Sequence, residues 1–246
     1  MLKISVATVC INCEDTIEQT IKSVIGQTYK NIEYIIYDGV SEDNTLSIAR
    51  RYENKKNVFV FSEPDNGLYD AMNKAALKAT GDYIIYMNSG DVFADDDVVE
   101  RMVPYLKECS EIVYGNVIRT KSVGDYLERY QGKHTPMFLA LQGKMMSHQS
   151  IFTRCDVMRQ YKFNLGYSIT ADYDFILRLL HDHRKMQYVD ITVSKVENIE
   201  GISSREENLM QMRKQDDASL KKNFPVCYFL LLIPKGIYRW LHDRRY

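Results

Sequence analysis

The chain lacks an excess of charge of either sign. Among its 246 residues, 32 are Lys or Arg and 33 are Asp or Glu. A protein that binds nucleic acid through the phosphates is normally clearly basic, so this balance argues against a nucleic-acid partner. Apolar and charged fractions of 45% and 26% are ordinary for a globular protein. The length suits one large domain, or one domain with an appendage.

Cysteine is scarce and scattered, at Cys10, Cys13, Cys109, Cys155 and Cys227. An odd, dispersed set is not a disulfide framework and favours a reducing compartment. Cys10 and Cys13 form a C-x-x-C, but a strand is expected to end at Cys10 and no second pair completes a zinc site. Buried or incidental thiols are the preferred interpretation, and a thioredoxin-like role is the alternative.

Long hydrophobic runs are also missing. No stretch approaches the ~20 apolar residues that a membrane-spanning helix needs. The N-terminus starts with a strand-like pattern, without the layout of a signal peptide. The sequence therefore predicts a cytoplasmic protein without a transmembrane segment.

Strand-like and helix-like patterns alternate along the first part of the chain. Short apolar runs predict buried strands, and apolar residues at helical spacing predict the helices between them. The predicted order is strand 3–9, helix 16–25, strand 32–37, helix 45–52, strand 58–62, helix 68–80 and strand 83–87. This alternation predicts an α/β fold with a Rossmann-like, mainly parallel central sheet and helices on both faces.

The rest of the sequence is less regular. It predicts helix 98–106, strand 111–117, an irregular connecting or acceptor-facing region 121–144, helix 170–180, one or two strands within 186–196, and helix 206–222. Residues 226–246 differ in kind, because a short apolar block is followed by aromatic residues among arginines. Such a C-terminal amphipathic helical tail, 223–246, suits the headgroup layer of a membrane. The alternative is a tail packed on the protein's own surface or on a partner.

The strand at Tyr83–Met87 is central to the functional prediction. It ends abruptly in Asn88, Ser89, Gly90 and Asp91. The carboxyl end of a central strand is where open α/β sheets bind ligands. Gly90 would let the backbone turn, and Asp91 could bind a divalent cation that also binds a diphosphate. A strand followed by a polar turn is an equally good interpretation of this stretch alone.

Two other predicted strands also end at acidic residues, Asp38 and Glu63. Right-handed crossovers place the carboxyl ends of parallel strands at one edge of the sheet. The sequence therefore predicts an acidic rim made of Asp38, Glu63 and Asp91.

Several separated motifs, taken in order, resemble glycosyltransferase family 2. They are ISVATVCINCEDTIEQTIKSVIGQTYKNIEYIIYDGVSEDNT, SEPDNGLYDAMNKAALKATGDYIIYMNSGD, MSHQSIF and ITADYDFILRLL, and they cover roughly Leu2 to Leu180. The resemblance implies a GT-A fold and an inverting, metal-dependent transfer of a sugar from a nucleotide-sugar. It divides the domain 1–222 into a nucleotide-binding half, about 1–118, and an acceptor-binding half, about 119–222.

The resemblance places the nucleotide near Thr8, Asp38 and Glu63, with Asp38 bonded to the base, a uracil. The segment Asn88–Asp91 takes the place of the family's D-x-D motif, so Asn88, Ser89 and Gly90 would line the donor site. Asn88 stands where an aspartate is often found. Asp91 would then be the main ligand of Mn²⁺ or Mg²⁺, with Asn88 at most a weak oxygen donor.

Asp172 matches the family's catalytic base, which takes the proton from the acceptor hydroxyl. Because Asp172 begins a predicted helix, a capping role is the structural alternative, and one residue can do both. Asp174 is the second candidate base, although helix geometry turns it in another direction.

Five further residues are weaker candidates for the donor site. Asp65, Asp70 and Asn73 would line the cleft, but a place on the helix surface explains Asp70 and Asn73 equally well. His148 would approach the diphosphate or the metal, with a structural histidine as the alternative. Arg205 would pair with the diphosphate from a lid, with an exposed charge as the simpler interpretation.

The expected function is inverting transfer from a UDP-sugar to a lipid-linked or growing glycan, at the cytoplasmic face of a bacterial inner membrane. One alternative, a nucleotidyltransferase, needs a basic, glycine-rich loop after the first strand, and residues 10–15 have neither glycine nor lysine. The other is a non-catalytic nucleotide-binding protein, which would not need both Asp91 and Asp172.

Overall fold

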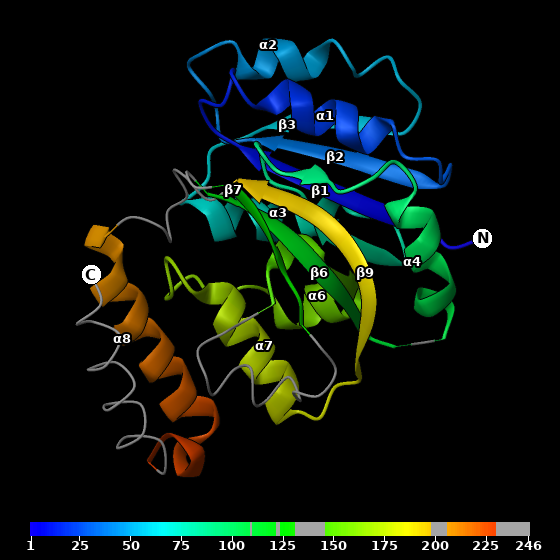
Figure 1. The fold of residues 1–246 in the computed structure, drawn as a ribbon. Helices are drawn as coiled ribbons and strands as arrows, with labels where there is room; N and C mark the ends of the chain where they lie inside the picture. The colour runs from blue at the N-terminus through cyan, green and yellow to red at the C-terminus, as the bar shows by residue number, and fades with distance from the viewer. Residues whose placement is uncertain (109, 122–123, 131–145, 198–205, 230–246) are drawn as a thin grey trace.

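The computed structural model describes residues 1–108, 110–121, 124–130, 146–197 and 206–229 (Figure 1). Its strands form one mixed sheet in the order β3-β2-β1-β4-β8-β6-β9-β5, with β7 paired to β6. Helices cover both faces, as the sequence predicts.

The first half of the chain is a parallel α/β unit. Its elements are β1 (Ile4–Cys10), α1 (Ile17–Ile25), β2 (Ile32–Asp38), α2 (Thr45–Arg50), β3 (Val58–Ser62), α3 (Leu68–Lys78) and β4 (Tyr83–Tyr86). Cys10 lies opposite Asp38, and Asp38 lies opposite Ser62, so these strands end level with one another. The predicted common edge is therefore confirmed for the carboxyl ends of β1, β2 and β3.

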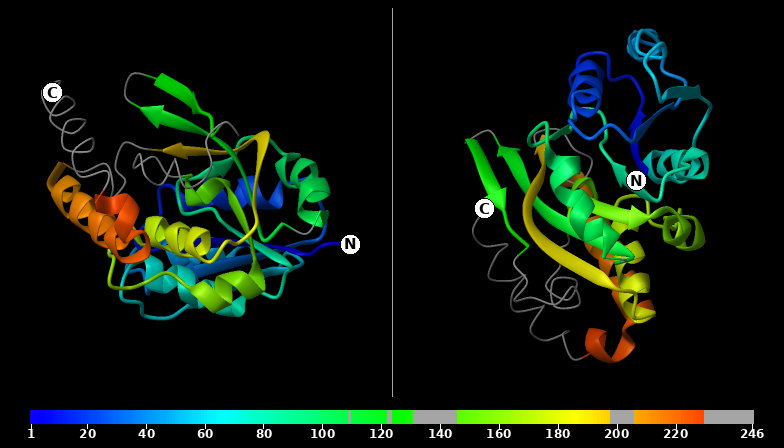
Figure 2. Two further views of the ribbon diagram at one scale, coloured as in Figure 1. Left: turned by 90° about the horizontal axis from the view of Figure 1, so that it is seen from below. Right: turned by 90° about the vertical axis from the view of Figure 1, so that its right-hand side faces the viewer.

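The second half widens the sheet. Its elements are β5 (Val92–Phe93), α4 (Val98–Lys107), β6 (Ile112–Lys121), β7 (Gly124–Glu128), η1 (His148–Ser150), β8 (Ile151–Arg154), α6 (Cys155–Tyr161), α7 (Ala171–His181), β9 (Met186–Glu197) and α8 (Glu206–Asn223). Strand β8 runs antiparallel to both β4 and β6. The long strand β9, yellow in Figures 1 and 2, curves along β6 and breaks its register at Asn116.

Two apolar cores form on opposite faces of the sheet. In β1, Ile4 and Val6 belong to the core with α1 and α4, whereas Ala7 and Val9 belong to the core with α3, α6 and α7. This is the alternation expected of a strand buried on both faces. Burial of one such aliphatic side chain contributes about 1.5–3 kcal/mol.

The structure departs from the predicted elements at β5, at β7 and from η1 through α6. Strand β7 lies inside region 121–144, so the prediction of an irregular segment is wrong there, while 131–145 lies outside the described residues. Strand β8 and helix α6 were not predicted. The C-terminal tail is helical over 225–229, and its remainder lies outside the described residues. Within the described part of the chain, no helix is long and apolar enough to cross a bilayer.

Candidate active site

A tight turn follows the central strand β4. The backbone N–H of Asp91 donates to the carbonyl of Asn88 at 3.0 Å, and Gly90 has a φ of +95°. Only glycine adopts this conformation without strain, so Gly90 allows the sharp turn that the sequence predicts. The Ser89 hydroxyl lies 2.9 Å from that of Thr16, which ties the turn to the segment before α1.

The turn buries the side chain of Asp91, which is 5% exposed. Its Oδ2 accepts a hydrogen bond of 2.8 Å from Nε2 of Gln149. The Ser147 hydroxyl donates to Oε1 of the same amide. This second bond orients the amide so that its NH₂ group faces the Asp91 carboxylate.

Asp172 is the second residue of α7, and the N-cap position belongs to Thr170. Its Oδ1 lies 3.0 Å from the Tyr69 hydroxyl and accepts from the backbone N–H of Tyr173 at 2.9 Å. Its Oδ2 lies 3.5 Å from Nδ1 of His148. The side chain keeps 27% of its surface exposed, so the carboxylate is held from several sides and still open to an acceptor.

His148 connects Asp172 to the turn after β4. Its Nε2 lies 3.0 Å from Nδ2 of Asn88. With Asn88 beside one ring nitrogen and Asp172 beside the other, the imidazole bridges the turn after β4 and the start of α7.

Two consecutive residues thus connect Asp91 and Asp172, the two acidic candidates that lie far apart in the sequence. His148 contacts Asp172, and Gln149 contacts Asp91. The alternative base, Asp174, is fully buried and pairs with Arg178 at 2.7 Å, so it faces no substrate.

The environment controls the charge of Asp172. Burial alone would raise the pKa of this carboxyl. Hydrogen bonds and charge from His148, with further bonds from Tyr69 and the Tyr173 backbone, outweigh burial and hold the pKa below its usual range. Burial and the Asp172 charge raise the pKa of Tyr69 well above 10, so its hydroxyl keeps its proton as a donor.

The predicted acidic rim is present, but its members differ in accessibility. Asp38 is fully buried and accepts from the Ser62 hydroxyl at 2.8 Å and from the Ser41 backbone at 3.1 Å. Glu63 is 47% exposed. Lys78 and the Tyr37 hydroxyl, each 3.1 Å away, lower the pKa of Glu63.

Asp65 closes the loop after β3 against the end of β2. Its Oδ1 accepts from the Gly67 backbone at 2.8 Å. A Cβ added at Gly39 would lie only 2.5 Å from Oδ2 of Asp65, so a side chain there would displace the Asp65 carboxylate.

Three predicted donor residues have structural partners instead. Thr8 is fully buried and donates to the Met87 carbonyl at 2.6 Å, so its hydroxyl has a structural partner. Asn73 bonds both the N–H and the carbonyl of Phe163, at 2.8 and 2.9 Å. Asp70 accepts from the Asn66 backbone at 2.9 Å and pairs with Lys74 at 3.0 Å.

Arg205 lies outside the described residues.

The sequence did not predict two residues of this site, Tyr69 and Gln149. Both stand inside quoted motifs, beside Asp70 and His148, so the motifs contained the signal. Their roles depend on tertiary contacts that spacing does not reveal.

The oxygen donors beside the turn suit a hard divalent cation. Oδ1 of Asn88 is buried without a hydrogen-bond partner, and it lies on the turn that presents Asp91. Carboxylate and amide oxygens are typical ligands of Mg²⁺ and Mn²⁺. Within the described residues, no three His, Cys, Asp or Glu side chains gather to hold a metal. A bound cation would therefore need further oxygens from a substrate or water.

Comparison with known proteins agrees with this geometry. The model of "Glycosyl transferase family 2" matches residues 5–166. An uncharacterised glycosyltransferase of Mycobacterium tuberculosis is 35% identical over 183 residues, which are 71% of this chain and 68% of that protein.

Two solved structures share the fold. Staphylococcus aureus TarS 1–349 in complex with UDP-GlcNAc has a TM-score of 0.70 at 17% identity, and the match covers 89% of this chain and 67% of TarS 1–349. The mannosyltransferase PcManGT of Pyrobaculum calidifontis, in complex with GDP-Man and Mn²⁺, has a TM-score of 0.65 at 15% identity, with 88% and 63% covered. The chain therefore belongs to glycosyltransferase family 2, and it is a glycosyltransferase of the GT-A fold.

Proposed function

We propose that the protein is an inverting glycosyltransferase that moves a sugar from a UDP-sugar to a hydroxyl of a lipid-linked or growing glycan. One observation carries the proposal: Asp91 and Asp172 contact the consecutive residues Gln149 and His148. A metal-binding acid and a base on opposite sides of one reacting bond need this proximity.

Asp172 is the proposed base. An acceptor hydroxyl attacks the anomeric carbon opposite the diphosphate, and a carboxylate oxygen of Asp172 takes the hydroxyl proton. The bond from the anomeric carbon to the acceptor oxygen forms as the bond to the diphosphate breaks. One displacement inverts the centre without a covalent intermediate. The low pKa of Asp172 keeps it ionised at neutral pH, as this step requires.

Asp91 and Asn88 are the proposed protein ligands of Mn²⁺ or Mg²⁺. When bound, the cation would stabilise the negative charge that develops on the leaving diphosphate. Gln149 holds the Asp91 carboxylate in one orientation for this purpose. Ser89 and Gly90, on the same turn, would line the donor site.

For the donor we propose a UDP-sugar, with Asp38, Glu63 and Asp65 around the nucleoside. The fold neighbours bind UDP-GlcNAc in one case and GDP-Man in the other, which supports a nucleotide-sugar as the donor. Arg205 stays a candidate partner of the diphosphate. Residues 1–118 would hold the donor and 119–222 the acceptor.

For the location we propose the cytoplasmic face of the inner membrane, with tail 223–246 in contact with lipid. The apolar block and the arginines of the tail support this proposal. It would bring the enzyme to lipid-linked or surface-destined glycans.

Two substitutions test the catalytic assignment. Asp172→Asn and Asp91→Asn should each abolish most transfer, because the first removes the base and the second removes a charged metal ligand. Asp96→Asn is the matched control, since Asp96 is exposed on the loop before α4. Near-full activity in both variants would reject the assigned roles. A thermal-shift screen of nucleotide-sugars, with and without Mn²⁺, would identify the donor independently.

A further inference from the structure

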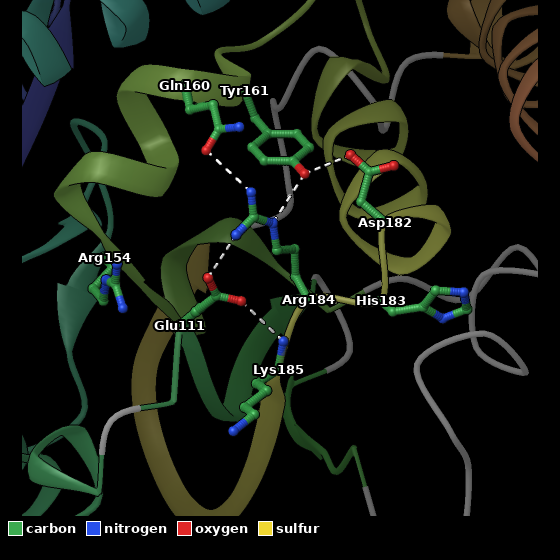
Figure 3. Close-up of a pocket in the computed structure, with 8 residues that line it drawn as sticks. All are labelled: Glu111, Arg154, Gln160, Tyr161, Asp182, His183, Arg184 and Lys185. Atoms are coloured by element: carbon green, nitrogen blue, oxygen red, sulfur yellow. Dashed lines mark hydrogen bonds and ion pairs between the residues drawn. The ribbon is translucent and has the colours of Figure 1, made fainter.

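The surface is also hollowed far from the Asp91–Asp172 site. The pocket in Figure 3, of about 450 Å³, is lined by Glu111, Arg154, Gln160, Tyr161, Asp182, His183, Arg184 and Lys185. Arg154 lies opposite Tyr83, the first residue of β4. The pocket therefore lies at the amino-terminal end of β4, whereas Asp91 follows its carboxyl end.

A second hollow of about 300 Å³ shares Gln160, Tyr161 and Asp182 with the first, and extends to His181 and Asn223. Together they form one groove from the start of β9 to the end of α8. We refer to it as the basal groove.

Helices α7 and α8 run side by side in the same direction (Figure 1). Gln215, in the middle of α8, accepts from the Ile169 backbone just before α7 at 3.0 Å. Near their ends, the rings of His181 and Phe224 lie 5.9 Å apart. The length of α7, about 15 Å for its eleven residues, separates this end from Asp172.

The arginines of the basal groove are structural. Arg184 bonds Glu111 at 2.8 Å and the Tyr161 hydroxyl at 3.0 Å. Arg154 pairs with Asp156. These contacts neutralise the guanidinium charges and keep the walls of the groove in place.

The unbalanced positive charge comes from lysines. Lys185 at the groove, and Lys221 and Lys222 at the end of α8, are exposed. None of the three forms an ion pair with the described residues. In a chain of net charge −1, this end of the molecule is therefore locally basic.

Apolar side chains adjoin these lysines. In the helical turn 225–229, Tyr228 packs inward with Phe224, against Leu220. Val226 and Phe229 face outward and are 70% and 59% exposed. The sequence that follows, 230–246, adds four Lys or Arg and one Asp. Exposed apolar side chains beside unpaired lysines are the chemistry that an anionic lipid surface complements.

We propose that this face, made of Lys185, Lys221, Lys222, Val226 and Phe229, docks the folded domain on an anionic lipid surface. The lysines meet the headgroup phosphates, and Val226 and Phe229 enter the boundary with the acyl chains. The docking does not depend on the catalytic roles proposed above.

Docking by this face also restricts the acceptor, an inference that rests on the proposed function. A bilayer at this end lies at the opposite edge of the sheet from the Asp91–Asp172 site. The acceptor hydroxyl must then extend away from the membrane, as the end of a growing glycan does. The first sugar on a lipid would lie too close to the bilayer.

Vesicle sedimentation of the full chain tests the docking face. Wild type should bind phosphatidylcholine vesicles that contain phosphatidylglycerol, and bind pure phosphatidylcholine much less. Lys221→Ala with Lys222→Ala should lower the partition coefficient about 30-fold, because each lysine contributes ~1 kcal/mol at an anionic surface. The matched control is Lys55→Ala with Lys56→Ala, two neighbouring exposed lysines before β3, which should bind as wild type does.

Equal losses in the two double variants, or no preference of wild type for anionic vesicles, would overturn the proposal. So would concentration-dependent self-association that Phe229→Ser abolishes, because the face would then belong to a second copy of the chain. Donor hydrolysis without vesicles should be the same in all variants. If wild type binds the vesicles but turns over no nucleotide-sugar, the catalytic proposal fails and the docking face stands.

Discussion

A single substitution at Gln149 tests whether its amide orients the Asp91 carboxylate for metal binding. Gln149→Met keeps the length of the side chain and removes its NH₂ group. The Asp91 carboxylate then loses the 2.8 Å bond to its Oδ2. A hydrogen bond to a charged group is worth about 1.5–3 kcal/mol, and loss of such a support typically lowers metal affinity about 10- to 100-fold.

The expected result is a 10- to 100-fold rise in the dissociation constant for Mn²⁺, measured by calorimetry on protein with UDP present. The metal concentration for half-maximal activity should rise in parallel, while kcat at saturating metal changes much less. A change in metal affinity with nearly constant kcat distinguishes a positioning role from partial misfolding. Misfolding would lower the amount of active protein without changing metal affinity.

The chain contains a closely matched control. At the opposite edge of the sheet, Gln187 accepts from the Ser110 hydroxyl at 2.8 Å and donates to Glu108 at 3.1 Å. This repeats the serine, glutamine and acid arrangement around Gln149. Gln187→Met should leave Mn²⁺ binding unchanged. If Gln149→Met behaves as Gln187→Met does, the reasoning that Gln149 orients a metal-binding carboxylate is refuted.

Two further predictions concern Asp172 and Asn73. His148→Gln removes the largest of the interactions that lower the pKa of Asp172, so this pKa should rise and the acid limb of the kcat/KM profile should move to higher pH. An unmoved limb would show that His148 does not influence the base. The stability that the depressed pKa provides in wild type is present above the usual aspartate range and lost as the pH falls through the folded value. Asn73→Ala leaves the N–H and carbonyl of Phe163 without partners and should lower the free energy of unfolding by about 2 kcal/mol in urea. Activity per folded molecule should stay constant. A rise in the KM for the donor would show instead that Asn73 lines the donor cleft.

The sequence predicts the parallel half of the sheet well because its strands are largely apolar runs, and β1, β2 and β4 are buried on both faces. It predicts less of the second half. Strand β8 has four residues and leads directly into the seven residues of α6, so no glycine or proline marks a boundary between them. Their conformations depend on pairing with β4 and β6, which are distant in the sequence.

Some features of the site can likewise be predicted from the local sequence, and others depend on tertiary contacts. Asp91 follows directly from the end of a central strand, but the Gln149 contact depends on η1 packing beside that strand. Thr8 also depends on a tertiary contact. It shares a face of β1 with Val6 and Cys10, which lie in the core, and its hydroxyl donates to the Met87 carbonyl after β4.

The proposed base and the α8 residues that support it lie outside the range that the family model matches. That match ends at residue 166, before Asp172. Gln215 of α8 accepts from the backbone N–H groups of Ile169 and Thr170, at 3.0 and 3.2 Å, where α7 begins. Helix N-termini need such acceptors, so α8 supports the turn that presents Asp172. Four residues further along α8, the Ser219 hydroxyl bonds Asp174 at 2.7 Å and fixes the parallel register. The helix that ends at the basic face thus also supports the turn that presents the proposed base.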